Sequence, residues 1–403
     1  MKNLIGIGLA LAATSSFATA NGNPTGDTPV PYFADTKVAY KVGKGLMFDG
    51  GESFSATLSH RIQVQWRYIN VENAADTNGA QARRLRQTVK GHAFNKDVTY
   101  MFNVEHAEAV SVKDIWLNWM FMKGDDMNIG LRLGQGKGRA GLQSDGSSGK
   151  LFHIERSSAT RTFADSRVWG ALFQGTAAEN NLGWHFGIFN QDSAARSTAA
   201  AEENNNAGQN EVNFSAGVRF SPNGLGDAEA WSEGDLEQSG DLYWQAGANV
   251  FVGNETTGAA DVEITTININ AAMKSGTGIA AQGEVWLRND DVDGGTDADS
   301  MGWYAQGSWT CPKEEGKTQW GAGVRISMVD FSDVPVFMTS ASGLTTTLAG
   351  AEGDVTEINA VFNQFYYGHA LKSQFGYTYQ DVNPMGGGDM TNHGIEFMVT
   401  GNF

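Results

Sequence analysis

Arginine and lysine recur at alternate positions in several segments of this sequence. Arg84, Arg86 and Lys90 share this spacing in one segment, and Arg61 and Arg67 share it in another. Guanidinium and ammonium groups bind phosphate and carboxylate, and the planar fork of arginine matches both anions. Side chains two residues apart point to the same face of a strand, so the spacing predicts rows of basic side chains if these segments are β-strands.

The segment that holds Arg61 alternates almost without a break between apolar and polar residues from 54 to 68. A period of two indicates a strand. The segment is longer than the five or six residues typical of a strand in a globular protein, but it suits a tilted membrane crossing of about 9 to 11 residues with rims. The pattern recurs at about residues 83–94, 97–105, 112–122, 127–135, 166–175, 182–190, 211–221, 241–252, 262–274, 278–288, 300–310, 318–330, 353–364, 368–381 and 393–403.

These segments predict an all-β fold, a transmembrane antiparallel β-barrel of about 16 strands. An even number lets the sheet close, and closure leaves no unpaired edge in lipid. The seven prolines lie outside the segments, and the connections alternate between short and long, as in bacterial barrels. Residues 222–240 are the exception, because a long connection stands where a short turn is expected. Aromatic residues near strand ends, such as Trp66, Tyr304 and Tyr377, predict interfacial girdles.

The less apolar face of each strand is assigned to the barrel interior. Basic residues on that face outnumber acidic ones about two to one, although the chain carries a formal net charge of −17, so most acid must lie in loops and rims. This asymmetry favours an anion path, and the alternative is that the basic residues are simply the solvated face of the wall. The inward basic set is Arg61, Arg67, Arg84, Arg86, Lys90, Arg132, Arg167, Arg219, Arg288, Arg325 and Lys372, and the acidic set is Glu105, Asp114, Glu284, Glu357 and Glu396.

Other kinds of chemistry find little support. Gly136, Gly138 and Gly141 have dinucleotide-binding spacing, but no helix follows to hold a pyrophosphate. Residues 289–300 approach a calcium-loop spacing, yet Ser300 stands where a bidentate glutamate is required, so an acidic outer loop that binds divalent cations loosely is the plainer interpretation. No metalloprotease or serine-hydrolase motif occurs, and we predict no enzyme activity, metal or cofactor.

The first twenty residues resemble an export signal, with Lys2 before an apolar run and small residues up to Ala20. We therefore expect a signal peptide at residues 1–20 with cleavage near Ala20, a periplasmic segment at 21–52 and the barrel at 53–403. Cys311 is the one cysteine, so no disulfide forms within the chain. The acidic charge argues against a nucleic-acid partner.

Three stretches resemble the phosphate-selective porins O and P. They are Arg83-Arg84-Leu85-Arg86 leading into Val89-Lys90-Gly91; Leu131-Arg132-Leu133-Gly134-Gln135 with Phe152-His153-Ile154-Glu155-Arg156-Ser157 and Arg167-Val168-Trp169-Gly170; and the terminal strand ending in Phe403. The resemblance implies a sixteen-stranded, usually trimeric, outer-membrane porin with a basic lumen. It also implies that the connection after the fifth strand, residues 136–165, folds inward and constricts the pore. The basic residues there that we assign to the pore are Lys137, Arg139, Lys150 and Arg156.

The leading hypothesis is an outer-membrane porin for passive diffusion of small hydrophilic solutes, with a preference for phosphate or other small anions. Its expected partners are membrane lipid, small anionic solutes and two further copies of the chain in a homotrimer. The anion path is predicted to comprise Arg61, Arg84, Arg86, Lys90, Arg132, Arg167 and Arg219, with the constriction residues named above. The alternatives are a barrel-borne outer-membrane enzyme, which needs a nucleophile and base near one rim, and a surface adhesin, which predicts shorter strands around several cores. Pairing of Glu155 with Arg156 to anchor the loop is the competing interpretation for those two residues.

Overall fold

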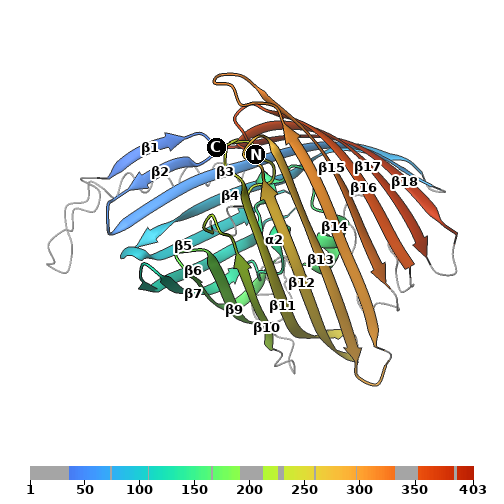
Figure 1. The fold of residues 1–403 in the computed structure, drawn as a ribbon, viewed down its shortest axis with the longest axis horizontal. Helices are drawn as coiled ribbons and strands as arrows, with labels where there is room; N and C mark the ends of the chain where they lie inside the picture. Colours follow the sequence, from blue (N-terminus) through green and yellow to red (C-terminus); the bar gives the residue numbers. More distant parts are fainter. Residues whose placement is uncertain are drawn as a thin grey trace.

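The computed structural model describes residues 36–72, 75–107, 109–164, 167–190, 212–225, 231–257, 260–295, 297–331, 353–384 and 388–403. The predicted signal peptide lies outside these ranges. Sixteen strands pair in antiparallel fashion with their neighbours in sequence and close into a ring (Figure 1). The last strand returns to the first of the ring through eleven paired positions, from Asn392 opposite Val71 to Asn402 opposite Arg61. The prediction of an antiparallel barrel of about 16 strands is confirmed.

The strands of the ring correspond one by one to the sixteen predicted segments. They are β3 (Phe54–Val71), β4 (Thr77–Ala93), β5 (Asn95–Glu105), β6 (Ser111–Lys123), β7 (Met127–Gly136), β8 (Val168–Ala177), β9 (Leu182–Asn190), β10 (Val212–Phe220), β11 (Tyr243–Thr257), β12 (Ala260–Lys274), β13 (Ile279–Val292), β14 (Ala298–Thr310), β15 (Gln319–Phe331), β16 (Gly353–Phe365), β17 (Leu371–Pro384) and β18 (Met390–Asn402). Pro384 ends β17 rather than lying beyond it, a position that the missing N–H of proline allows.

A short hairpin precedes the ring and has no counterpart among the predicted segments. Strands β1 (Lys37–Lys41) and β2 (Gly45–Asp49) pair with each other, and β2 pairs with β3 from Ser55 to Leu58 (Figure 1). Gly45 adopts a φ of 98° and passes so close to β3 that a Cβ atom would lie 2.1 Å from the Leu58 carbonyl oxygen. Five-residue strands show too little alternation to be recognised from sequence.

The two faces of the wall differ as a barrel in lipid requires. On β3, Val64 and Trp66 are 50% and 42% exposed, whereas Gln63 and Gln65 are 0% and 1% exposed and point inward. Tyr377, like Trp66, lies on the exposed face. Tyr304, for which the sequence predicts a place in the girdle, is instead buried in the interior. Its hydroxyl donates a hydrogen bond to Glu284, so the polar group of this residue selects the interior face. Within the described ranges no helix is long and apolar enough to span a bilayer.

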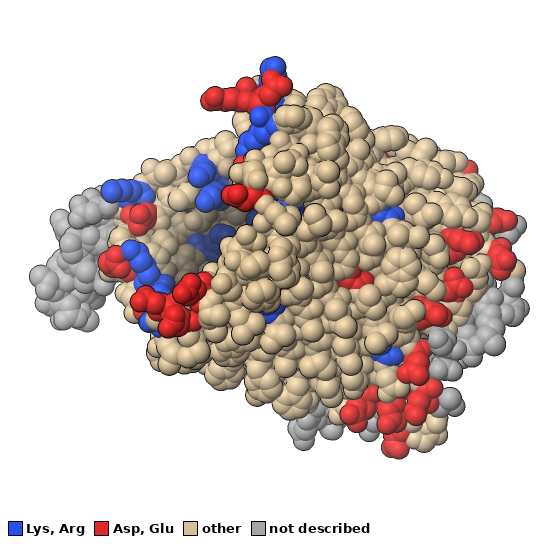
Figure 2. Space-filling view, in the orientation of Figure 1, with Lys and Arg blue, Asp and Glu red and all other residues tan. Residues whose placement is uncertain are grey.

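Charge is unevenly distributed over the outside. Figure 2 shows Lys and Arg on the wall of a hollow at the left of the view, and acidic side chains gathered at the lower right, near the β13–β14 connection of Figure 1. The exposed carboxylates around that connection are Asp291, Asp293, Asp297 and Asp299. The excess acid of the chain therefore includes a cluster at a rim, as the sequence predicts. None of the described groups of histidine, cysteine and carboxylate side chains is arranged to hold a metal ion.

Candidate functional site

The segment between β7 and β8 runs through the interior of the barrel. It contains helix α2 (Leu142–Asp145), the 3-10 turn η2 (Ser148–Lys150) and helix α3 (Ser158–Phe163). At one wall, the backbone N–H groups of Leu142 and Gln143 donate to the carboxylate of Glu284 on β13, at 2.8 and 2.7 Å. At another wall, Arg61 on β3 donates to the hydroxyl oxygens of Ser147 and Ser148, which lie beside and within η2. The segment thus bridges two distant parts of the ring.

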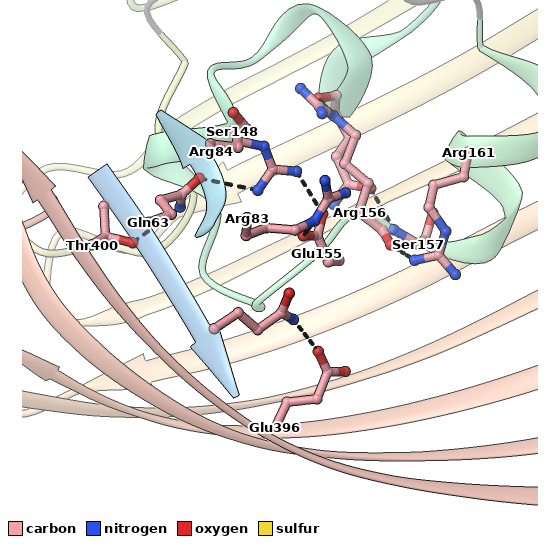
Figure 3. Close-up of polar contacts among 12 residues, drawn as sticks. Gln63, Arg83, Arg84, Ser148, Glu155, Arg156, Ser157, Arg161, Glu396 and Thr400 are labelled. Atoms are coloured by element: carbon pink, nitrogen blue, oxygen red, sulfur yellow. Dashed lines mark hydrogen bonds and ion pairs between the residues drawn. The ribbon is translucent and has the colours of Figure 1, made fainter. Parts of the chain in front are cut away.

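Glu155 is an ionic anchor of this segment with two arginine partners. Its two carboxylate oxygens accept hydrogen bonds from Arg83 Nε and from an Arg84 terminal nitrogen, both at 2.7 Å (Figure 3). Its carbonyl oxygen accepts a third from Arg325 on β15, at 2.8 Å. Burial alone would raise the pKa of Glu155, but the charges and hydrogen bonds of Arg84 and Arg83 outweigh burial and hold that pKa well below its usual range.

The depressed pKa of Glu155 predicts a dependence of loop docking on pH. Because this pKa is lower in the docked state than the ordinary value of 4.5, the contribution of Glu155 is complete above that value and is lost as the pH falls below it. We expect the single-channel current noise to rise as the pH falls below about pH 4.5. The Glu155→Gln variant should be noisy at every pH. A rise centred above about pH 5 would assign the effect to another group.

The long connection after β10 also enters the barrel, which explains why it breaks the alternation of loop lengths. Glu233, in this connection, accepts hydrogen bonds from the backbone N–H of Phe152 at 2.7 Å and from Gln143 Nε2 at 2.8 Å. Asp235 accepts a hydrogen bond from the backbone N–H of Gly278, the residue before β13. This connection therefore meets the β7–β8 segment inside the lumen, and the two hold each other.

Apolar side chains seal the meeting point of these two segments. Phe152 is fully buried and packs with Ile154 of the same segment and with Leu236 of the β10–β11 connection. The wall contributes Val361, Phe365 and Met398 to this cluster. Helix α3 packs in a second cluster, where Phe163 occupies the space beside Gly302, at which a Cβ atom would lie 2.3 Å from the Phe163 ring. The interior is therefore filled along β13 to β18.

A cavity of about 560 Å³ remains on the other side of the β7–β8 segment. Residues of β5 to β12 line it, together with α2 and the loop before it. Basic, amide and aromatic side chains are among its lining residues. The charged and amide side chains among its lining residues are Lys123, Arg132, Arg139, Arg219, Asp145, Asn118, Asn128, Asn180, Asn249, Asn270 and Gln174.

Two residues that the sequence assigns to the anion path, Arg132 and Arg219, line this cavity, together with Arg139 of the predicted constriction loop. Arg139 has a φ of 64° and donates to Gln174 Oε1 at 3.0 Å, with Asp145 at 3.8 Å. The guanidinium of Arg132 lies 4.5 Å from the centre of the Trp116 ring, a cation–π arrangement that fixes its orientation.

The structure places most of the other predicted residues in contacts with the wall or the loop. Arg84 binds Glu155, Arg86 binds Glu105 at 2.7 Å, and Arg167 lies 3.2 Å from Asp114. Arg61, as described, binds serine hydroxyls. Lys90 is exposed on the same face of β4 as Arg84 and Arg86, and Lys150 is half-buried in η2.

The basic residues of the loop mainly stabilise the loop itself. Lys137 donates to the carbonyl oxygens of Asp145 and Gly146, and Arg156 donates to those of Gln143 and Gly146. Burial, followed by the nearby positive charges, lowers the pKa of Arg156 to about 9, which leaves it charged at neutral pH. Glu155 thus anchors the loop to Arg83 and Arg84 of the wall, whereas Arg156 binds backbone carbonyls of the loop itself.

Sequence reasoning missed Arg83 and Trp116. A β-bulge lies where Gln63 pairs with Arg84 and Val64 pairs with Ala82, so Arg83 is the extra residue and reaches the interior beside Arg84. No pattern in the sequence signals that bulge. Trp116 occupies an inward position on β6 between Asp114 and Asn118, and simple alternation from Asp114 would have found it.

A closed ring of sixteen antiparallel strands, apolar outside and polar around an interior cavity, defines an outer-membrane porin. The chain belongs to the phosphate-selective porin O and P family, whose model matches residues 56–322. It is therefore a channel of the bacterial outer membrane, as the sequence resemblance implies.

Solved structures share the fold. An anion-selective porin from Comamonas acidovorans matches with a TM-score of 0.56 and 11% identity, over 87% of this chain and 100% of the other. The outer membrane channel DcaP of Acinetobacter baumannii matches with a TM-score of 0.56 and 10% identity, over 87% of this chain and 98% of the other. OmpT of Vibrio cholerae in a trimer form matches with a TM-score of 0.50 and 13% identity, over 87% of this chain and 100% of the other. No curated protein matches the chain significantly in sequence.

Proposed function

We propose that this porin passes small anions passively through the cavity between the β7–β8 segment and the wall from β6 to β12. The observation that carries the proposal is the charge of the lining, where four basic residues face a single carboxylate, Asp145, among the described residues. Positive side chains around a water-filled constriction attract anions and repel cations. In this proposal α2 and Arg139 form the constriction.

The finer assignments follow from the same proposal. Arg132, Arg139 and Arg219 form the anion path, whereas Arg61, Arg84, Arg86, Arg156 and Arg167 position the loop and add positive potential. Phosphate and other small anions are the solutes, and the protein assembles as a homotrimer in lipid, which the trimer form of the Vibrio cholerae OmpT structure supports. Residues 1–20 serve as the export signal.

The reversal potential across a planar bilayer tests the anion preference. With purified protein and a potassium chloride gradient, we expect a reversal potential of the sign that chloride selectivity gives, and a weaker selectivity at high salt because salt screens the lining charges. A cation-selective reversal potential would overturn the proposal. Anion selectivity at low salt that is lost only at high salt would support it.

A further inference from the structure

The lining of the cavity carries more hydrogen-bonding capacity than a simple anion requires. We propose that the preferred solutes are hydroxylated organic anions, such as sugar acids and sugar phosphates, rather than inorganic anions. This inference rests on the proposed anion path and specifies its substrate class. Three features of the cavity carry it: the amide groups, two unpartnered ring nitrogens and the size of the space.

Amide side chains from four strands face the cavity. Asn118 on β6, Asn128 on β7, Gln174 on β8 and Asn249 on β11 line it. They are already oriented by their neighbours: Gln174 Nε2 donates to Asn118 Oδ1 at 3.1 Å, and Asn128 Nδ2 donates to a threonine hydroxyl at 3.2 Å. An amide offers both donors and acceptors, and a hydroxyl group does the same, so this surface matches a solute with several hydroxyl groups.

Two ring nitrogens of lining residues lack a hydrogen-bond partner. Trp116 Nε1 and His185 Nε2 are buried, and neither has a hydrogen-bond partner among the described protein groups. Both residues line the cavity. Buried polar atoms of this kind are normally hydrogen-bonded, so a hydroxyl group or water that reached either nitrogen would gain a hydrogen bond there.

The charges and the space suit a solute that has an anionic group at one end and hydroxyl groups at the other. Arg132, Arg139 and Arg219 supply donors for a phosphate or carboxylate, while the amides lie beside them on the wall. Gly183 and Gly247 also line the cavity and add no side chain to it. The volume of about 560 Å³ lies within the range of about 300 to 1,000 Å³ that small-molecule sites have. An inorganic anion would use the arginines and leave the amides to water.

Block of the chloride current tests this inference. Glucose 6-phosphate, gluconate, inorganic phosphate and glucose are each added to the porin in a planar bilayer, and the half-blocking concentration is measured. We expect glucose 6-phosphate and gluconate to block at roughly tenfold lower concentration than phosphate or glucose, since hydrogen bonds to the amide groups are added to the ionic contact. Equal block by phosphate and glucose 6-phosphate would overturn the inference.

Two variants assign the effect to the lining. Trp116→Phe keeps an aromatic ring beside Arg132 but removes the N–H, and Asn249→Leu replaces an amide by an apolar group of similar size. Each should raise the half-blocking concentration of gluconate by roughly threefold to tenfold and leave that of phosphate unchanged. The matched control is Trp309→Phe, since Trp309 is 50% exposed on the outer face of β14.

The outcomes separate this inference from the proposed function. A cation-selective current overturns both. An anion-selective current with no difference between the organic and inorganic anions overturns this inference alone. Unchanged block by gluconate in both lining variants also overturns it, provided that both variants give channels of normal conductance.

Discussion

Replacing Glu155 by glutamine is expected to release the β7–β8 segment from the β4 wall while the barrel stays closed. The change leaves Arg84, which is 6% exposed, without its carboxylate. Breaking a buried ion pair costs about 3 to 5 kcal/mol, and water in the lumen places this case near the lower figure. The opening equilibrium of the segment should therefore rise about a hundredfold.

Proteolysis measures that opening. Arg156 and Arg161 are trypsin sites within the segment, and cleavage of a transiently open region follows its open population. We expect a large increase in the cleavage rate of folded Glu155→Gln protein, with unchanged heat-modifiable migration because the ring of strands is intact. Glu52→Gln is the control, since the Glu52–Lys96 pair is largely exposed and such pairs contribute little. Wild-type cleavage rates in Glu155→Gln would show that Arg325 and the apolar cluster suffice to hold the loop.

Replacing Arg219 by glutamate is expected to reduce anion selectivity at least fivefold. The substitution changes the charge beside the path by two units. For an ion passing within about 8 Å in water, this amounts to about 1 kcal/mol, and it acts in opposite directions on chloride and potassium. The permeability ratio from reversal potentials at low salt is the measurement, because salt screens the effect.

The control for this variant makes the same charge change outside the cavity. Lys317→Glu lies in the β14–β15 connection, where the lysine side chain is 69% exposed. It should change the permeability ratio much less than Arg219→Glu does. Equal ratios in Arg219→Glu and wild-type protein would mean that ions pass elsewhere, and the assignment of the cavity as the path would be wrong.

The strands could be predicted from sequence because their pattern follows from one requirement. A wall with lipid outside and water inside must alternate along every strand, and this period is visible without knowledge of the neighbours. The bulge that turns Arg83 inward and the β1–β2 hairpin lack this signal. Tyr304 shows another limit, because an aromatic residue with a polar group fits either face until its hydrogen-bond partner is known.

The residues of the site were harder to assign than the strands. Alternation places Arg84 and Arg132 equally inward, but it does not show which of them meets a carboxylate and which lines the cavity. That difference depends on the route of the β7–β8 segment, which passes Arg84 and leaves Arg132 beside Trp116. The route depends in turn on Glu233, from a connection that is distant in sequence and whose length alone marked it as unusual.

The anchoring of the β7–β8 segment also has a mechanical consequence. Glu155 ties β4 to β15, and the segment from Ser148 to Leu142 ties β3 to β13, so both act as struts across the same part of the ring. A barrel that is cross-linked in this way resists flattening between the linked strands. Lateral pressure from the bilayer should therefore deform the opposite arc, the wall of the cavity, and membrane thickness or tension becomes a means to change the width of the pore.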